Sequence, residues 1–154
     1  AGKSLAGLQF LSRIFHDRTL HKYYICLTKG KIEKPDHIRG YLHKDKKTNK
    51  VIVSRQEFKD SLPIETKYRP LGSNGKITLL EVELITGRTH QIRAHLAGTG
   101  HPLLGDTKYG DSEFNKQYIR QGVRHQLLHA YRFVIPETVQ TFVAPAPEVL
   151  CKII

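Results

Sequence analysis

The sequence predicts one α+β domain, residues 1–154, built on a mainly antiparallel β-sheet. Short segments of alternating apolar residues are separated by tight turns, and helical patterns occur near both ends and once in the middle. This order lacks the regular strand–helix alternation of a parallel α/β fold. With 154 residues, 39% of them hydrophobic, the chain is long enough to bury a real core.

The N-terminal part predicts a helix followed by a strand. Residues 4–18 place apolar side chains at helical spacing, and Ser4 is a candidate N-cap. Residues 21–30, HKYYICLTKG, alternate in a way that predicts a strand with both faces in contact with protein. We therefore expect an amphipathic helix packed on a sheet.

Hairpins follow. Residues 37–42 and 51–54 flank the basic, turn-rich sequence KDKKTNK and predict a hairpin with a charged tip. Residues 61–71 predict a strand that places Ile64, Thr66 and Tyr68 on one face. The sequence GSNGK then predicts a tight turn into a strand over residues 77–85.

The stretch 84–110 is unusually rich in Arg, His and Gln. Thr86 and Gly87 end the preceding strand, and Gly87 suits a positive φ. We expect Thr89 to cap a helix over 90–97 that docks on the sheet. The side chains at the start of this helix lie where backbone N–H groups attract anions.

The C-terminal part returns to strands. Residues 111–123 show no clear period and predict an irregular excursion with a single helical turn. Residues 125–135 alternate well and predict a central strand, and a short last strand is expected around 141–144. Residues 147–154 predict a helix with Pro147 near its first turn.

Charge is the most informative property of the composition. Lys and Arg outnumber Asp and Glu by 25 to 14, which gives a net charge of +11 and a pI near 9.8. So basic a domain attracts polyanions, most often nucleic acid. The aromatic content is 8%, without Trp, which argues against a single-strand binder built on stacking.

Cysteine usage and hydropathy bear on the compartment. Cys26 and Cys151 are expected to be two buried, unpaired thiols, which indicates a reducing environment. No apolar run approaches a membrane span, and no signal peptide is visible, so we expect a cytoplasmic protein without a membrane partner. The spacing of Cys and His predicts no metal site.

Two strings, TGRTHQIRAH (86–95) and GHPLLGDTKYG (100–110), carry a specific resemblance. They resemble the signature of the RluA-type pseudouridine synthases, which isomerise uridine in ribosomal and transfer RNA, and in particular the RluC-like branch that acts on 23S RNA. The resemblance is supported at 4–30, at DSEF (111–114) and at FVAPAP (142–147). Over 37–71 it holds only in outline.

The resemblance implies the roles of several residues. Tyr24 matches the tyrosine that stacks on the target base and is proposed to take its C5 proton, and Arg93 matches the residue that pairs with the catalytic aspartate. No cofactor is implied, and the protein is expected to be a monomer that binds structured RNA. RNA contacts are expected from further residues, namely Lys22, Arg88, Thr89, His90, Gln91 and Lys108.

The aspartate nucleophile of the family is missing. None of the six aspartates stands in an H-R-L-D type motif. Asp106 is the tempting substitute, but its place in the GDTKYG turn predicts an Asx-type bond to backbone N–H groups. We expect a C-terminal part of a catalytic domain, inactive by itself, whose aspartate lies upstream of Ala1.

Other interpretations stay open. The chain could be a non-catalytic RNA-binding module of the same fold, or a member of the family directed at transfer RNA. A basic nucleic-acid-binding α+β domain unrelated to the family is a further alternative.

Overall fold

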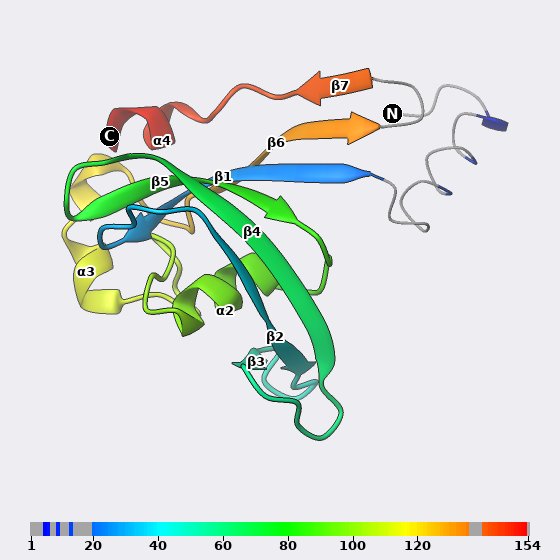
Figure 1. Ribbon diagram of the computed structural model, residues 1–154. Helices are drawn as coiled ribbons and strands as arrows, with labels where there is room; N and C mark the ends of the chain where they lie inside the picture. The colour runs from blue at the N-terminus through cyan, green and yellow to red at the C-terminus, as the bar shows by residue number, and fades with distance from the viewer. Residues whose placement is uncertain (1–4, 7–8, 10–12, 14–19, 136–139, 154) are drawn as a thin grey trace.

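The computed structural model describes residues 5–6, 9, 13, 20–135 and 140–153. Its described strands form a seven-stranded antiparallel sheet in the order β3-β2-β4-β5-β1-β6-β7 (Figure 1). The predicted α+β, mainly antiparallel class is therefore confirmed. The strands are β1 (His21–Lys29), β2 (Asp36–Lys44), β3 (Val51–Ser54), β4 (Leu62–Ser73), β5 (Ile77–Leu84), β6 (Leu128–Ile135) and β7 (Gln140–Val143).

The helices whose bounds lie within the described residues are short, and they stand between β5 and β6 or after β7. They are α2 (Gln91–Gly98), α3 (Ser112–Lys116), the 3-10 helix η1 (Ile119–Gln121) and α4 (Glu148–Ile153). The predicted irregular excursion after residue 110 contains the two short helices α3 and η1. The first of them begins where it does because the Asp111 side chain accepts a hydrogen bond from the N–H of Phe114 and caps α3. The predicted helix 4–18 falls largely outside the described residues.

The predicted strands are confirmed, with bounds that differ by a few residues, and so is the face predicted for β4. In β4, Ile64, Thr66 and Tyr68 are buried on one face. The prediction that β6 is a central strand is wrong. On its outer side β6 pairs with the edge strand β7, so it is the penultimate strand of the sheet. The centre of the sheet is β5, which pairs with β4 and β1 along nearly its whole length.

The two faces of the sheet have separate cores. On one face, Ile92 and Leu96 of α2 pack against Cys26, Leu80 and Val82, as predicted for the docking face of this helix. On the other face, Ile25, Leu27 and Ile77 pack against Leu150 and Ile153 of α4. Figure 1 shows α2 below the curved sheet and α4 above it, near the turn that joins β4 to β5. The α2 face carries the candidate site.

The two cysteines are unpaired, as predicted. Cys26 is fully buried on β1, and burial raises the pKa of its thiol to about 12. The expectation that both thiols are buried is wrong for Cys151, which is exposed on the short helix α4. None of the described helices is both long and apolar enough to cross a membrane.

Candidate active site

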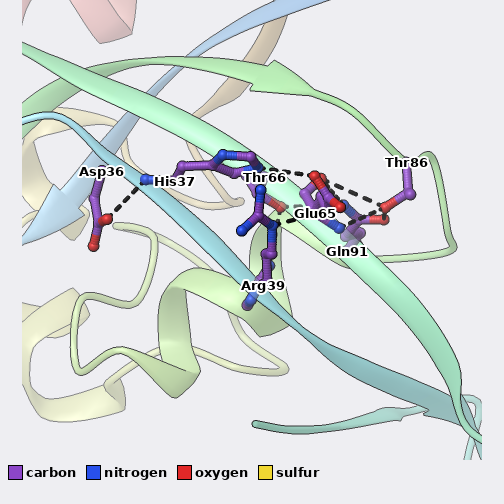
Figure 2. Close-up of polar contacts among 8 residues, drawn as sticks. Asp36, His37, Arg39, Glu65, Thr66, Thr86 and Gln91 are labelled. Atoms are coloured by element: carbon purple, nitrogen blue, oxygen red, sulfur yellow. Dashed lines mark hydrogen bonds and ion pairs between the residues drawn. The ribbon is translucent and has the colours of Figure 1, made fainter.

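The turn from β5 into α2 is fastened to β4 by side-chain hydrogen bonds. The Thr86 hydroxyl oxygen accepts from the N–H of Glu65 at 2.9 Å and lies 2.8 Å from Oε1 of Gln91, to which it donates. The Gln91 amide donates to the carbonyl of Glu65 at 2.9 Å and lies 3.1 Å from the Thr66 hydroxyl oxygen. Figure 2 shows this network beside the hydrogen bond that joins His37 of β2 to the Glu65 side chain of β4.

Gln91 has no hydrogen-bonding capacity left for RNA. Its Oε1 accepts from Thr86 and from the N–H of Arg88, and its Nε2 donates twice into β4. An amide side chain has two acceptor and two donor positions, so all of them are used. The side chain is 2% exposed. We therefore assign Gln91 a structural role in place of the expected RNA contact.

His95 continues this network into the core. Its Nδ1 lies 3.0 Å from the Thr66 hydroxyl, and burial lowers its pKa to about 4. The imidazole is therefore neutral at physiological pH. Gly40 of β2 lies close to this imidazole: an added Cβ there would be in ordinary contact with His95 Nε2 at 3.5 Å, but only 2.7 Å from the carbonyl oxygen of Ser54 on β3, which it would clash with.

The start of α2 differs from the sequence prediction. The N-cap is His90, not Thr89, and it adopts the left-handed conformation with φ 56° and ψ 18°. Gly87 has no positive φ; the left-handed residue of this turn is His90. The Gln91 side chain accepts from the Arg88 N–H and donates to the Glu65 carbonyl, and so ties the turn before the helix to β4. A non-glycine residue in this region is strained and frequent at functional sites.

Arg93 is held by Asp106. Its Nε and Nη2 donate to Oδ2 and Oδ1 of that carboxylate, both at 2.8 Å. Asp106 is 1% exposed and also accepts from the backbone N–H groups of Lys108 and Tyr109, which confirms the predicted Asx-type bond. Burial alone would raise the pKa of Asp106, but the bonds from Arg93 and the backbone outweigh it and lower the pKa.

Tyr24 and Arg93, the two catalytic residues that the resemblance implies, line one cavity of about 360 Å³. Tyr24 comes from β1 and Arg93 from α2. Burial raises the pKa of Tyr24, so it is a neutral phenol at physiological pH. The cavity also has Arg88 and His90 in its wall, and its remaining lining residues are Leu84, Gln91, Ile92, Gln126 and Leu128. None of these described lining residues is a carboxylate.

The other predicted RNA contacts are Lys22, Thr89, Lys108 and Arg88, and the first three do not line this cavity. Lys22 lies on β1 with its Nζ 3.9 Å from the position that a Cβ of Gly87 would take, so it is beside the turn. Thr89 is exposed and does not line the cavity. Lys108 donates to the carbonyl of Asn49 at 2.7 Å and thus reaches the β2–β3 turn. The Nε of Arg88 is buried without a hydrogen-bond partner in the described part of the chain.

Sequence reasoning missed Tyr109 and the cavity residues Gln126 and Leu128. Tyr109 stands in the GDTKYG string, and its ring lies 5.2 Å from the Arg93 guanidinium carbon. Leu128 is the first residue of β6 and Gln126 precedes this strand, both more than thirty residues beyond Arg93. A larger cavity, about 450 Å³, opens around Tyr23 and Glu81, but none of the predicted site residues lines it.

Comparison with known proteins agrees with this geometry. A family described as RNA pseudouridylate synthase matches residues 1–98. The chain belongs to the RNA pseudouridylate synthase family. It is 31% identical over 147 residues to ribosomal large subunit pseudouridine synthase C of Vibrio vulnificus, which covers 94% of this chain and 46% of that protein. It is 36% identical over 126 residues to ribosomal large subunit pseudouridine synthase D of Nitrosomonas europaea, which covers 79% of this chain and 35% of the relative.

The fold has solved counterparts in this family. Human RNA pseudouridylate synthase domain containing 1 superposes with a TM-score of 0.77 at 23% identity, over 95% of this chain and 62% of that chain. Human RNA pseudouridylate synthase domain containing 4 superposes with a TM-score of 0.72 at 21% identity. The chain spans about half the length of the curated relatives it matches.

Proposed function

We propose that this protein is a pseudouridine synthase that isomerises uridines in the RNA of the large ribosomal subunit. The observation that carries the proposal is the shared cavity of Tyr24 and Arg93, which are sixty-nine positions apart in the sequence. The names of its relatives supply the substrate class. The net charge of +11 fits a polyanionic partner.

Tyr24 and Arg93 have distinct tasks in this proposal. The flat, half-buried ring of Tyr24 offers a stacking face to a uracil taken out of the RNA stack. As a neutral phenol it must lose its own proton before it can accept one from C5. Arg93 uses Nε and Nη2 on Asp106, and its Nη1 makes no hydrogen bond within the described residues. That free nitrogen can orient a second carboxylate.

The nucleophile is the second carboxylate. Asp106 is excluded from this role because the Arg93 fork and backbone N–H groups occupy both of its oxygens. We propose that the family's aspartate comes from a part of the protein beyond this sequence and meets Nη1 of Arg93. The isomerisation exchanges a carbon–nitrogen for a carbon–carbon bond, so no redox cofactor is needed.

In this proposal, basic side chains near the cavity bind the phosphates of the RNA. Arg88 lines it and has a buried Nε without a partner in the described part of the chain. Lys22 lies beside Gly87 in the turn before α2, and Lys108 is close enough to the lining residue His90 to lower its pKa. Arg88 is the strongest of these candidates, because a buried guanidinium N–H without a partner is costly unless a ligand accepts from it. We also propose that the protein acts as a monomer in the cytoplasm, where its two free thiols persist.

Tritium release tests the function. The complete gene product that contains this chain is incubated with a 23S ribosomal RNA transcript carrying 5-tritiated uridine. Exchange of the C5 hydrogen releases tritium, and we expect multiple turnovers and pseudouridine in the digested RNA. Transfer RNA is the matched substrate control. Tight RNA binding without tritium release would contradict the proposal and favour the non-catalytic RNA-binding module.

A further inference from the structure

Tyr109 joins the candidate site to the β2–β3 hairpin. Its hydroxyl oxygen lies 2.9 Å from Nδ1 of His90 and 2.9 Å from the backbone nitrogen of Val51, the first residue of β3. Its ring meets the His90 imidazole edge to face, with centroids 5.6 Å apart, and lies against the Arg93 guanidinium. One side chain thus contacts two cavity residues and a strand that is more than fifty positions away.

The direction of these hydrogen bonds follows from the chemistry of the groups. The backbone N–H of Val51 can only donate, so the Tyr109 oxygen accepts from it. Among the described residues, Nδ1 of His90 is the one acceptor within hydrogen-bond distance of the phenolic proton, so the geometry favours donation from Tyr109 to Nδ1. A neutral imidazole that accepts at Nδ1 carries its proton on Nε2.

The surroundings of His90 keep its imidazole uncharged. Burial and the cations of Arg93, Lys108 and Lys44 lower its pKa, and the Asp106 carboxylate opposes them only in part. A charged imidazole would donate from Nδ1 and leave the Tyr109 proton without an acceptor among the described residues. His90 is therefore unsuited to bind a phosphate as a cation.

We propose that Tyr109 is a positioning residue that holds His90 as the Nε2–H tautomer, and that His90 presents this one donor to an acceptor oxygen of the bound RNA. His90 lines the cavity, and its Nε2 makes no hydrogen bond within the described part of the chain. Its left-handed backbone is fixed by the turn that Gln91 anchors. The RNA part of this inference rests on the proposed function.

Nitrogen NMR tests the positioning without RNA. In the complete gene product labelled with ¹⁵N-histidine, we expect the His90 ring at pH 7 to be neutral and protonated at Nε2. Tyr109→Phe keeps the aromatic ring but removes the hydroxyl, and should yield a mixture with the Nδ1–H tautomer. A wild-type His90 that is charged or protonated at Nδ1 would overturn the proposal, whatever the stability of the variant.

Substitution tests the donor. Asparagine tolerates the left-handed backbone but lacks a donor at the Nε2 position, so His90→Asn should weaken binding of the 23S transcript on the order of tenfold. Glutamine reaches farther, and His90→Gln should restore part of the affinity. Unchanged affinity in His90→Asn would overturn the donor role.

A double-mutant cycle connects the two residues. If Tyr109 acts through His90, Tyr109→Phe weakens RNA binding in the wild type but costs nothing more in the His90→Asn background. Fully additive losses would show that Tyr109 acts elsewhere and would overturn the inference. Absence of tritium release by the wild-type protein would instead refute the proposed function and leave the tautomer result standing.

Discussion

The guanidinium of Arg93 and the carboxylate of Asp106 form a bidentate ion pair with both nitrogen–oxygen distances at 2.8 Å. The Asp106 side chain is completely buried and that of Arg93 is 13% exposed. This pair fixes one edge of the guanidinium and leaves the other edge for the cavity. Because Asp106 lies in the turn after α2, the ion pair makes this turn part of the candidate site.

Asp106→Asn should destabilise the fold strongly, because it leaves a largely buried guanidinium without a counter-charge. We expect a loss of about 3–5 kcal/mol in the free energy of unfolding, the usual cost of breaking such a pair from one side. Urea unfolding monitored by circular dichroism measures it. Glu113→Gln is the matched control, since its ion pair with Lys116 is exposed and should matter little. Equal effects of the two substitutions would contradict the importance of the pair.

His95 should make the fold sensitive to mild acid. Its folded pKa is lowered to about 4, below the ordinary value near 6.5, so the unfolded state binds a proton more readily. The stabilisation is complete above pH 6.5 and is lost as the pH falls towards 4. At about 1.4 kcal/mol per pKa unit, the loss approaches 3 kcal/mol. Urea unfolding between pH 7 and 4.5 should show this slope, and His95→Gln should flatten it.

Gly105 should tolerate no side chain. Its φ is +82°, and an added Cβ would lie 2.1 Å from the carbonyl oxygen of His125. Gly75 is the matched control, with a φ of +88° and no atom within 4 Å of an added Cβ. Gly75→Ala should cost only the left-handed backbone penalty, about 1–2 kcal/mol. Gly105→Ala should cost clearly more; thermal unfolding of both variants compares them, and equal shifts in Tm would refute the argument.

RNA binding by the complete gene product should depend steeply on salt. With several Lys and Arg contacts to phosphate, affinity should fall about a thousandfold between 50 and 200 mM salt. Arg88→Gln should reduce the slope of log affinity against log salt by about one unit, whereas His90→Asn should leave the slope unchanged because His90 is neutral. Filter binding measures both, and a flat wild-type response would contradict a phosphate-binding surface.

The strands could be predicted from the sequence because their alternation is local. Ile64, Thr66 and Tyr68 occupy the predicted face, and the turn chemistry of GSNGK joins β4 to β5 as expected. The start of α2 could not be placed so well, since Gln91 sets it through bonds to β4, a strand some twenty-five residues earlier. The choice of His90 as the left-handed residue follows from that distant anchor.

The site was predicted in outline from Tyr24 and Arg93, which share the cavity. The partner of Arg93 was not predicted, because Asp106 comes close only once the loop after α2 folds back. Tyr109 was missed for a similar reason: its link to Val51 exists only when the β2–β3 hairpin docks against the turn. Such long-range contacts leave no periodic pattern in the sequence.

The central claim is that Arg93 serves chemistry and not RNA affinity alone, and the kinetics of Arg93 variants in the complete gene product test it most directly. An interaction that matters in the transition state lowers kcat when it is lost, so Arg93→Ala should reduce tritium release at saturating RNA by about a hundredfold or more. Arg93→Lys should recover part of the loss, since the charge remains but the fork does not. An Arg93→Ala protein with weakened RNA binding and nearly unchanged kcat would contradict the account.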